Sequence, residues 1–84
     1  MENIHTRILH WFSEQRDISS YEISSLLALN YFEEELVDSF GILALIMFIE
    51  EEFQITFTED HFQERRFSNI NGLVEIIKEL QDAL

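Results

Sequence analysis

The sequence has no cysteine and no proline, and its 84 residues include only two glycines. Without cysteine the chain can form neither a disulfide nor a thiolate metal site, so any thiol chemistry has to come from an attached group. Internal repeats, low-complexity tracts and linker-like stretches are also missing. We therefore expect one small domain over residues 1–84.

Positive charge is scarce. Five Lys and Arg face 17 Asp and Glu, which gives a formal net charge of -12. The phosphates of nucleic acids and anionic membrane surfaces would be repelled, so neither is expected as a partner. No Lys or Arg lies between Arg16 and Arg65, and this field of one sign favours partners with basic surfaces. Arg65 and Arg66 are expected to pair with nearby carboxylates.

A long apolar run is missing as well, and no secretory leader is expected. The longest apolar run, Ile42–Ile49, has eight residues, too few for stable insertion across a bilayer. The first residues, MENIHTR, lack the basic start and apolar segment of a secretory signal, so a cytoplasmic location is the default expectation. With 46% hydrophobic residues and eight phenylalanines, the chain is expected to fold despite its charge.

The stretch from Leu36 to Phe53 is expected to organise the fold. Asp38 and Ser39 are good helix-capping residues, and the apolar run begins shortly after them. This pattern predicts a helix from Ser39 to about Phe53 that is apolar on nearly every side. In so short a chain such a helix must be central, and we expect something other than this chain to cover one flank part of the time.

Positions along this helix have different expected roles. Core positions are Leu45, Ile49 and Phe53, whereas a core role and a partner surface fit Leu43 and Met47 equally well. The run Glu50-Glu51-Glu52 is either a solvated helix end or a patch for basic partners. Carboxylates at a helix C-terminus interact unfavourably with the helix dipole. Because the chain tolerates this cost, the run favours a role in binding.

Two other long helices are predicted. Residues Ile4 to Gln15 have amphipathic spacing, with Asn3 as the cap and Gln15 on the inner face beside Ile4, Ile8, Trp11 and Phe12. A last helix from about Asn69 to Gln81 follows a capped start. A short helical turn is expected from Thr58 to Glu64, after an extended connection that places Ile55 and Phe57 in the core. Arg7 and His61 are expected on the wet surface.

Residues 21–30 leave two interpretations open. They form either a short helix capped by Ser19 or Ser20, or an ordered loop that puts Ile23, Leu26, Leu27 and Leu29 on the core. The next segment has four expected hydrophobic anchors: Tyr31, Phe32, Leu36 and Val37. The predicted fold class is all-α, a bundle of three long helices and one short one.

Ser39 has a structural and a chemical interpretation. A capping role for Asp38 or Ser39 is the more common use of such a pair. The alternative is that Ser39 carries a phosphate ester, since a helix N-terminus favours an anion. The dipole contributes about 0.3–1 kcal/mol, which does not by itself select this serine.

Three segments together resemble the acyl and peptidyl carrier protein family: residues 30–41 (NYFEEELVDSFG), 49–55 (IEEEFQI) and 67–74 (FSNINGLV). The likeness covers roughly residues 30–80 in order and spacing, and Asp38-Ser39-Phe40-Gly41 is also similar to the D-alanyl carrier branch. It implies an acyl-carrier-protein-like four-helix bundle in which Ser39 receives a 4'-phosphopantetheine arm from a phosphopantetheinyl transferase. It also implies that Asp38 shapes the helix start and contacts that enzyme.

The sequence departs from the family pattern in two places. Glu35 stands three residues before Asp38, where many relatives have glycine, so the approach to Ser39 is expected to bend differently. Gly41 and Ala44 stand where fatty-acid carriers often have acidic residues, which argues against recognition by standard fatty-acid synthase enzymes. Docking on partners is therefore expected to use an apolar helix face and its acidic end: Phe40, Ile42, Leu43, Ile46, Met47, Glu50 and Glu51.

Intrinsic catalysis is not expected. The Gly-x-Ser-x-Gly elbow is absent, and the chain cannot build the sheet of an α/β-hydrolase. His5 and His10 diverge around a helix, and the glutamate runs lack the spacing of a calcium loop. No catalytic residue and no metal site are predicted.

The sequence thus predicts a monomeric carrier that holds acyl or aminoacyl groups as thioesters on the arm at Ser39. Its expected partners are the transferase and the loading and transferring enzymes, which would present basic docking surfaces. The alternative is an acidic helical adaptor without a prosthetic group, which docks its apolar helix into one partner. Fatty acyl, polyketide, aminoacyl and D-alanyl cargo all fit a serine at a helix start.

Overall fold

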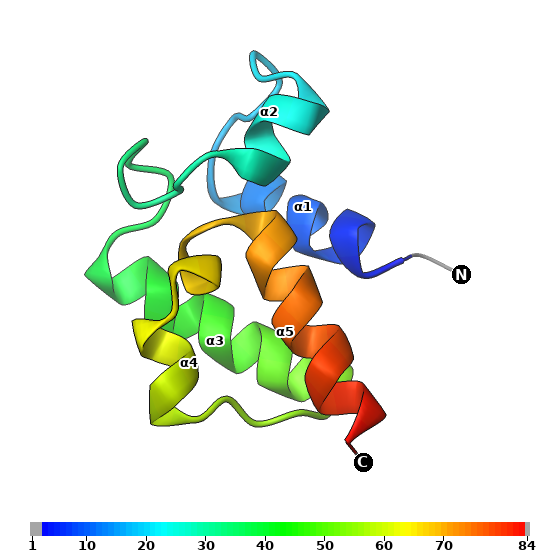
Figure 1. Cartoon of the computed structure of the whole chain (residues 1–84). Helices are drawn as coiled ribbons and strands as arrows, with labels where there is room; N and C mark the ends of the chain where they lie inside the picture. The colour runs from blue at the N-terminus through cyan, green and yellow to red at the C-terminus, as the bar shows by residue number, and fades with distance from the viewer. Residues whose placement is uncertain (1–2, 84) are drawn as a thin grey trace.

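The structure is a computed structural model that describes residues 3–83 (Figure 1). In chain order the elements are α1 (Ile4–Gln15), α2 (Ile23–Ala28), α3 (Ser39–Phe53), α4 (Glu59–Gln63), the 3-10 helix η1 (Arg65–Ser68) and α5 (Ile70–Asp82). No β-strand occurs within these residues, which confirms the all-α class. The predicted count is wrong, because two short α-helices and a 3-10 helix accompany the three long ones.

The long helices α1 and α5 each begin directly after an asparagine that caps them. Asn3 caps α1 by accepting a hydrogen bond from the Thr6 backbone N–H at 2.8 Å. Asn69 does the same for α5 through the N–H of Gly72 at 2.6 Å. The observed α5 lies one residue further along the chain than the predicted helix, because Asn69 is the cap and not the first helical residue.

Residues 21–30 contain a short helix, α2, which decides between the two interpretations. The expected serine cap is wrong: Glu22 is the N-cap and its side chain makes no capping bond. Ser19 instead turns back to Asp17, whose carboxylate accepts its N–H at 3.0 Å and its hydroxyl at 2.6 Å. Leu26 is buried in the core, whereas Ile23 is 61% exposed.

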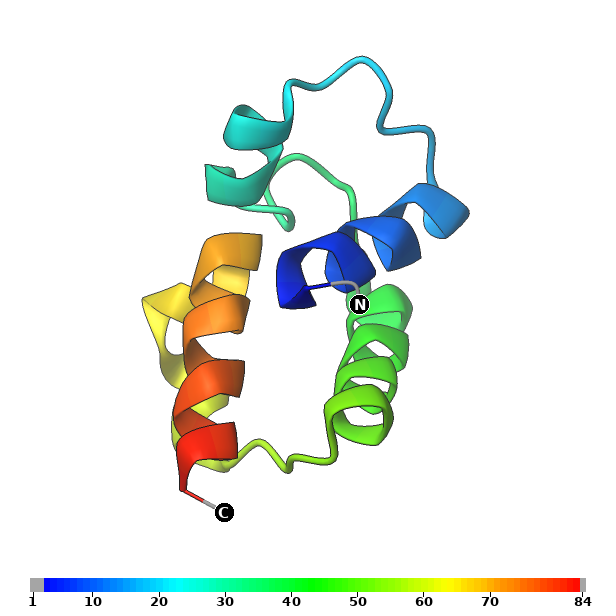
Figure 2. The same ribbon diagram turned by 90° about the vertical axis from the view of Figure 1, so that its right-hand side faces the viewer.

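Figure 2 shows α3 and α5 on opposite sides of the molecule, with α1 across one end and the connection over residues 54–58 across the other. Side chains from all three long helices and from the connections fill the space between them. Ile55 and Phe57 are buried as expected. Gln15 is exposed instead, because the inner face of α1 ends at Phe12. The most deeply buried large side chains are Tyr31, Phe12, Ile8, Leu26, Leu45, Ile49, Ile70, Leu73, Ile76 and Ile77.

Candidate functional site

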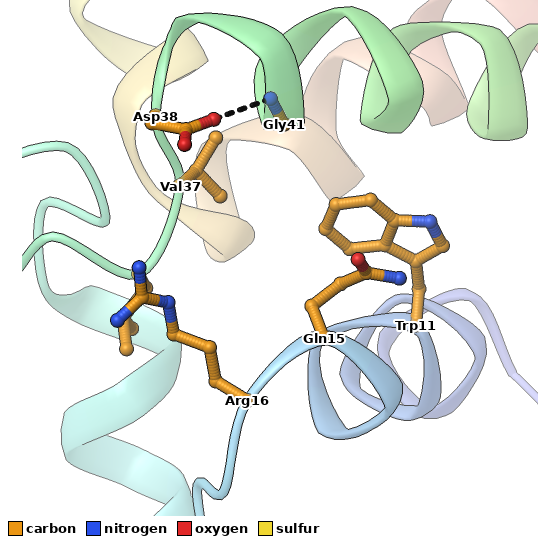
Figure 3. Close-up of a pocket in the computed structure, with 7 residues that line it drawn as sticks. Trp11, Gln15, Arg16, Val37, Asp38 and Gly41 are labelled. Carbon is orange, nitrogen blue, oxygen red and sulfur yellow. Dashed lines mark hydrogen bonds between the residues drawn. The ribbon is translucent and has the colours of Figure 1, made fainter.

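Asp38 caps the start of α3. Its Oδ1 accepts the backbone N–H of Gly41 at 2.7 Å (Figure 3). The same oxygen accepts the backbone N–H of Phe40 at 3.1 Å. Two of the N–H groups that a helix leaves unpaired in its first turn are therefore satisfied by this one carboxylate.

Ser39 is the first residue of α3, and it is exposed. Its hydroxyl makes no hydrogen bond with any residue of the described range 3–83. The capping interpretation therefore applies to Asp38, and the Ser39 oxygen is left facing solvent.

The segment before α3 is fixed by Tyr31. Its backbone N–H donates to the carbonyl of Ser68 at 3.0 Å, and its own carbonyl accepts from Leu36 and Val37 at 3.0 and 3.3 Å. The buried Tyr31 hydroxyl donates to the carbonyl of Phe67, and burial raises the pKa of Tyr31. The chain is thus anchored a few residues before Ser39.

Two residues of this segment, Phe32 and Glu35, bear on the sequence predictions. Phe32 is 40% exposed, so it is not one of the core anchors, although its ring lies 4.9 Å from that of Tyr31. Glu35 has φ of 57°, in the left-handed region that glycine adopts without steric cost. Where the resembling family often has glycine, this chain keeps a conformation suited to glycine.

One side of α3 is apolar and open to solvent. Phe40, Leu43 and Met47, which we call the α3 stripe, are 83%, 58% and 68% exposed. Their spacing of three and four residues puts them on one helix face. Of the other expected docking residues, Ile42 and Ile46 are half-buried and pack against the core. The structure therefore assigns Leu43 and Met47 to the surface, and it buries Leu45, Ile49 and Phe53 as predicted.

The three glutamates at the end of α3 have different surroundings. Glu50 accepts the backbone N–H of Phe57 at 2.9 Å, which fastens the connection after α3. Glu52 forms an ion pair with Arg7, whose guanidinium also lies 5.2 Å from the Phe53 ring centroid. Arg7 is therefore half-buried and not on the wet face as expected. Among residues 3–83, no hydrogen bond or ion pair engages the carboxylate of the exposed Glu51, one turn beyond the α3 stripe.

A pocket of about 170 Å³ lies between the end of α1 and the start of α3 (Figure 3). Its walls combine apolar side chains with a cation, an amide and a carboxylate: Trp11, Gln15, Arg16, Leu36, Val37, Asp38 and Gly41. The contribution of the α1 segment to this pocket was not predicted from the sequence. The signal that could have indicated it was Arg16, the last cation before the acidic half of the chain.

Comparisons with known proteins add no family: no protein-family model matches the chain, and no curated protein is significantly similar to it. Within residues 3–83, no helix has both the length and the apolar character needed to cross a membrane. Any function therefore has to be inferred from the sequence and from the geometry of the described residues.

Proposed function

We propose that this chain is an acyl carrier protein that holds acyl or aminoacyl groups as thioesters on a 4'-phosphopantetheine arm at Ser39. The observation that carries the proposal is the Ser39 hydroxyl, which is exposed at the start of a long helix and is not used as the cap. The resemblance of Asp38-Ser39-Phe40 to the attachment motif of carrier proteins supports the same assignment.

The surroundings of Ser39 fit a phosphate ester. The oxygen is accessible to a modifying enzyme, and the helix dipole stabilises an anion at this end by about 0.3–1 kcal/mol. Asp38 caps the first turn of α3, so the Ser39 oxygen is not needed for the cap. When bound, the arm supplies the thiol that a chain without cysteine lacks.

Delivery is the role of such a protein, and catalysis belongs to its partners. A tethered cargo reaches each active site at a high effective concentration. The α3 stripe with Glu51 suits an enzyme surface that has an apolar depression bordered by Lys or Arg. Because the chain carries a net charge of -12, association with such a surface should slow as salt is added.

Intact-mass measurement tests the attachment. Incubation with coenzyme A and a broad-specificity phosphopantetheinyl transferase should add the mass of one arm. Ser39→Ala should abolish the gain, and Ser20→Ala, at another exposed serine, should retain it. No gain under conditions that load a known carrier would refute the proposal. The α3 stripe would then favour an acidic adaptor that docks without a prosthetic group.

A further inference from the structure

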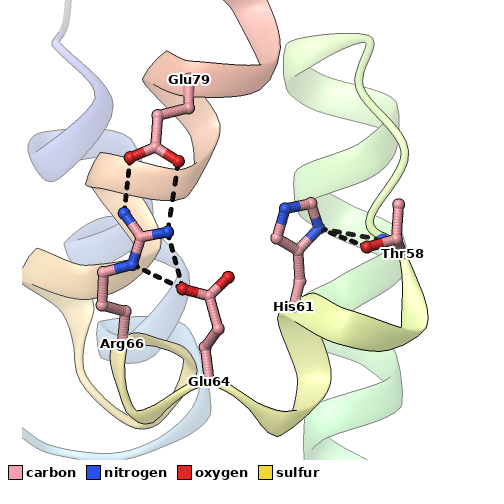
Figure 4. Close-up of polar contacts among 5 residues, drawn as sticks. All are labelled: Thr58, His61, Glu64, Arg66 and Glu79. Atoms are coloured by element: carbon pink, nitrogen blue, oxygen red, sulfur yellow. Dashed lines mark hydrogen bonds and ion pairs between the residues drawn. The ribbon is translucent and has the colours of Figure 1, made fainter.

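The start of α4 is closed by a histidine. Thr58 is the N-cap, and His61 stands three residues on, where capping boxes usually have Glu or Gln. Its Nδ1 accepts the backbone N–H of Thr58 at 3.0 Å, and the Thr58 hydroxyl lies 3.2 Å from the same nitrogen (Figure 4). The backbone N–H of His61 in turn donates to the backbone carbonyl of Thr58 at 3.1 Å.

This arrangement requires one protonation state. A neutral imidazole can accept at Nδ1 while it keeps its proton on Nε2, but an imidazolium has N–H groups on both nitrogens. Protonation of His61 would therefore place two donors, the ring N–H and the Thr58 N–H, against each other. It would also put positive charge in the first turn of a helix, where the dipole is unfavourable to it.

We propose that His61 makes the capping of α4 sensitive to pH. The first turn of α4 is capped while the His61 ring is neutral, and the helix loses this cap and unwinds when the ring gains a proton. Histidine is the side chain whose charge ordinarily changes between pH 5 and 8. The proposal does not depend on modification of Ser39.

Charged groups lie on the helix of His61 and on the elements packed against it. Glu59 and Asp60 belong to the first turn of α4 itself. Glu79 of α5 is close enough to interact electrostatically with His61. Arg66 of η1 pairs with Glu79 at 2.6 Å and with Glu64 at 2.7 Å, which offsets these two carboxylates (Figure 4).

Opening of α4 would disturb a cluster of aromatic rings. A helix of five residues has too few backbone hydrogen bonds to persist by itself, so caps and packing hold it. The Phe62 ring lies 5.1 Å from Phe67 and 6.1 Å from Phe57, both of which are buried. Because the carbonyl of Phe67 accepts the Tyr31 hydroxyl, movement here would reach the segment that leads to Ser39.

NMR on the full chain tests the inference, with the His61 ring and the Thr58 amide followed from about pH 7.5 to about pH 5.5. The Thr58 amide shift should change with the midpoint of the His61 ring. Protection of α4 amides against exchange, corrected for intrinsic rates, should fall about fivefold as the ring is charged, the usual consequence of losing an N-cap.

Variants separate the cap from other effects of pH. In His61→Gln an amide oxygen replaces Nδ1 and does not titrate, so α4 should stay protected at both ends of the range. His61→Ala should be poorly protected throughout, and His10→Gln should behave as the native chain. The inference is overturned if the Thr58 amide does not follow the His61 ring, if the ring stays neutral throughout, or if His61→Gln keeps the pH dependence.

Discussion

The hydroxyl of Tyr31 donates a hydrogen bond to the backbone carbonyl of Phe67, and both side chains lie in the core. This bond joins the turn before α3 to the 3-10 helix η1, and the two segments are far apart in the sequence. The turn before α3 leads to Ser39, so this core contact helps to hold the segment that carries the candidate attachment site.

Tyr31→Phe should destabilise the fold without changing its shape. The ring remains, but the carbonyl of Phe67 loses its hydrogen-bond partner inside the core, which costs about 1–3 kcal/mol. Urea unfolding measures the loss as a lower midpoint. Tyr21→Phe is the matched control, since Tyr21 is only half-buried and its hydroxyl makes no bond within residues 3–83. Equal stability of the two variants would show that the Tyr31 bond contributes nothing.

Gly72→Ala should be severely destabilising. A Cβ on Gly72 would lie 1.9 Å from the carbonyl oxygen of Arg66, which is backbone and cannot turn aside. α5 would have to move away from η1, and overpacking of this kind costs about 1–3 kcal/mol or more. Gln81→Ala, at an exposed position of the same helix whose side chain makes no hydrogen bond within residues 3–83, should stay within about 0.5 kcal/mol of the native chain. Thermal unfolding of both variants checks the contrast, and an unchanged midpoint for Gly72→Ala would contradict the close packing.

Much of the fold follows from local signals in the sequence. Asn3 and Asn69 each precede an apolar repeat of helical period, Asp38 precedes a continuous apolar run, and each of the three caps a long helix. α2 has no such signal, because its N-cap Glu22 makes no capping bond and its helix is held by tertiary packing of Leu26. Local patterns therefore predict the three long helices and the short α4, but they leave α2 undecided and do not predict η1.

The candidate site could be predicted only in part. The sequence marks Ser39 and the apolar helix after it, but it does not say which flank of that helix faces solvent. That depends on how α1 and α5 pack, and it separates Leu43 and Met47 from Ile42 and Ile46. The roles of Arg7 and His61 were missed for two different reasons. Arg7 meets a residue distant in the sequence, and His61 occupies a capping position that usually holds Glu or Gln.

The ion pair between Arg66 and Glu79 should contribute a pH-dependent part of the stability. Hydrogen bonds from the Arg66 guanidinium lower the pKa of Glu79 from its ordinary value of 4.5. A lowered pKa in the folded state stabilises the fold above that ordinary value, and the contribution is lost as pH falls through the lowered one. Glu79→Gln should therefore be less stable than the native chain near neutral pH and approach it in acid.

Urea unfolding from neutral to acid pH measures the difference in stability between Glu79→Gln and the native chain. Glu75→Gln removes the same charge from α5 and corrects for the general relief of repulsion in an acidic chain. Because Glu79 is exposed, added salt should reduce the effect. A difference between Glu79→Gln and Glu75→Gln that stays constant down to strongly acid pH would exclude the pairing as its source.

The α3 stripe should matter for partners and not for folding. Leu43→Ala should change the free energy of unfolding by less than about 0.5 kcal/mol, because this side chain is 58% exposed. Leu45→Ala, two residues along the same helix, should cost about 2–5 kcal/mol, since it leaves a cavity in the core. Urea unfolding compares the two, and the rate of mass gain with the transferase gives the second readout.

We expect Leu43→Ala to slow loading at limiting carrier concentration while its stability is unchanged. A native loading rate for both Leu43→Ala and Met47→Ala would remove the α3 stripe from the docking surface and leave the assignment of Ser39 untouched.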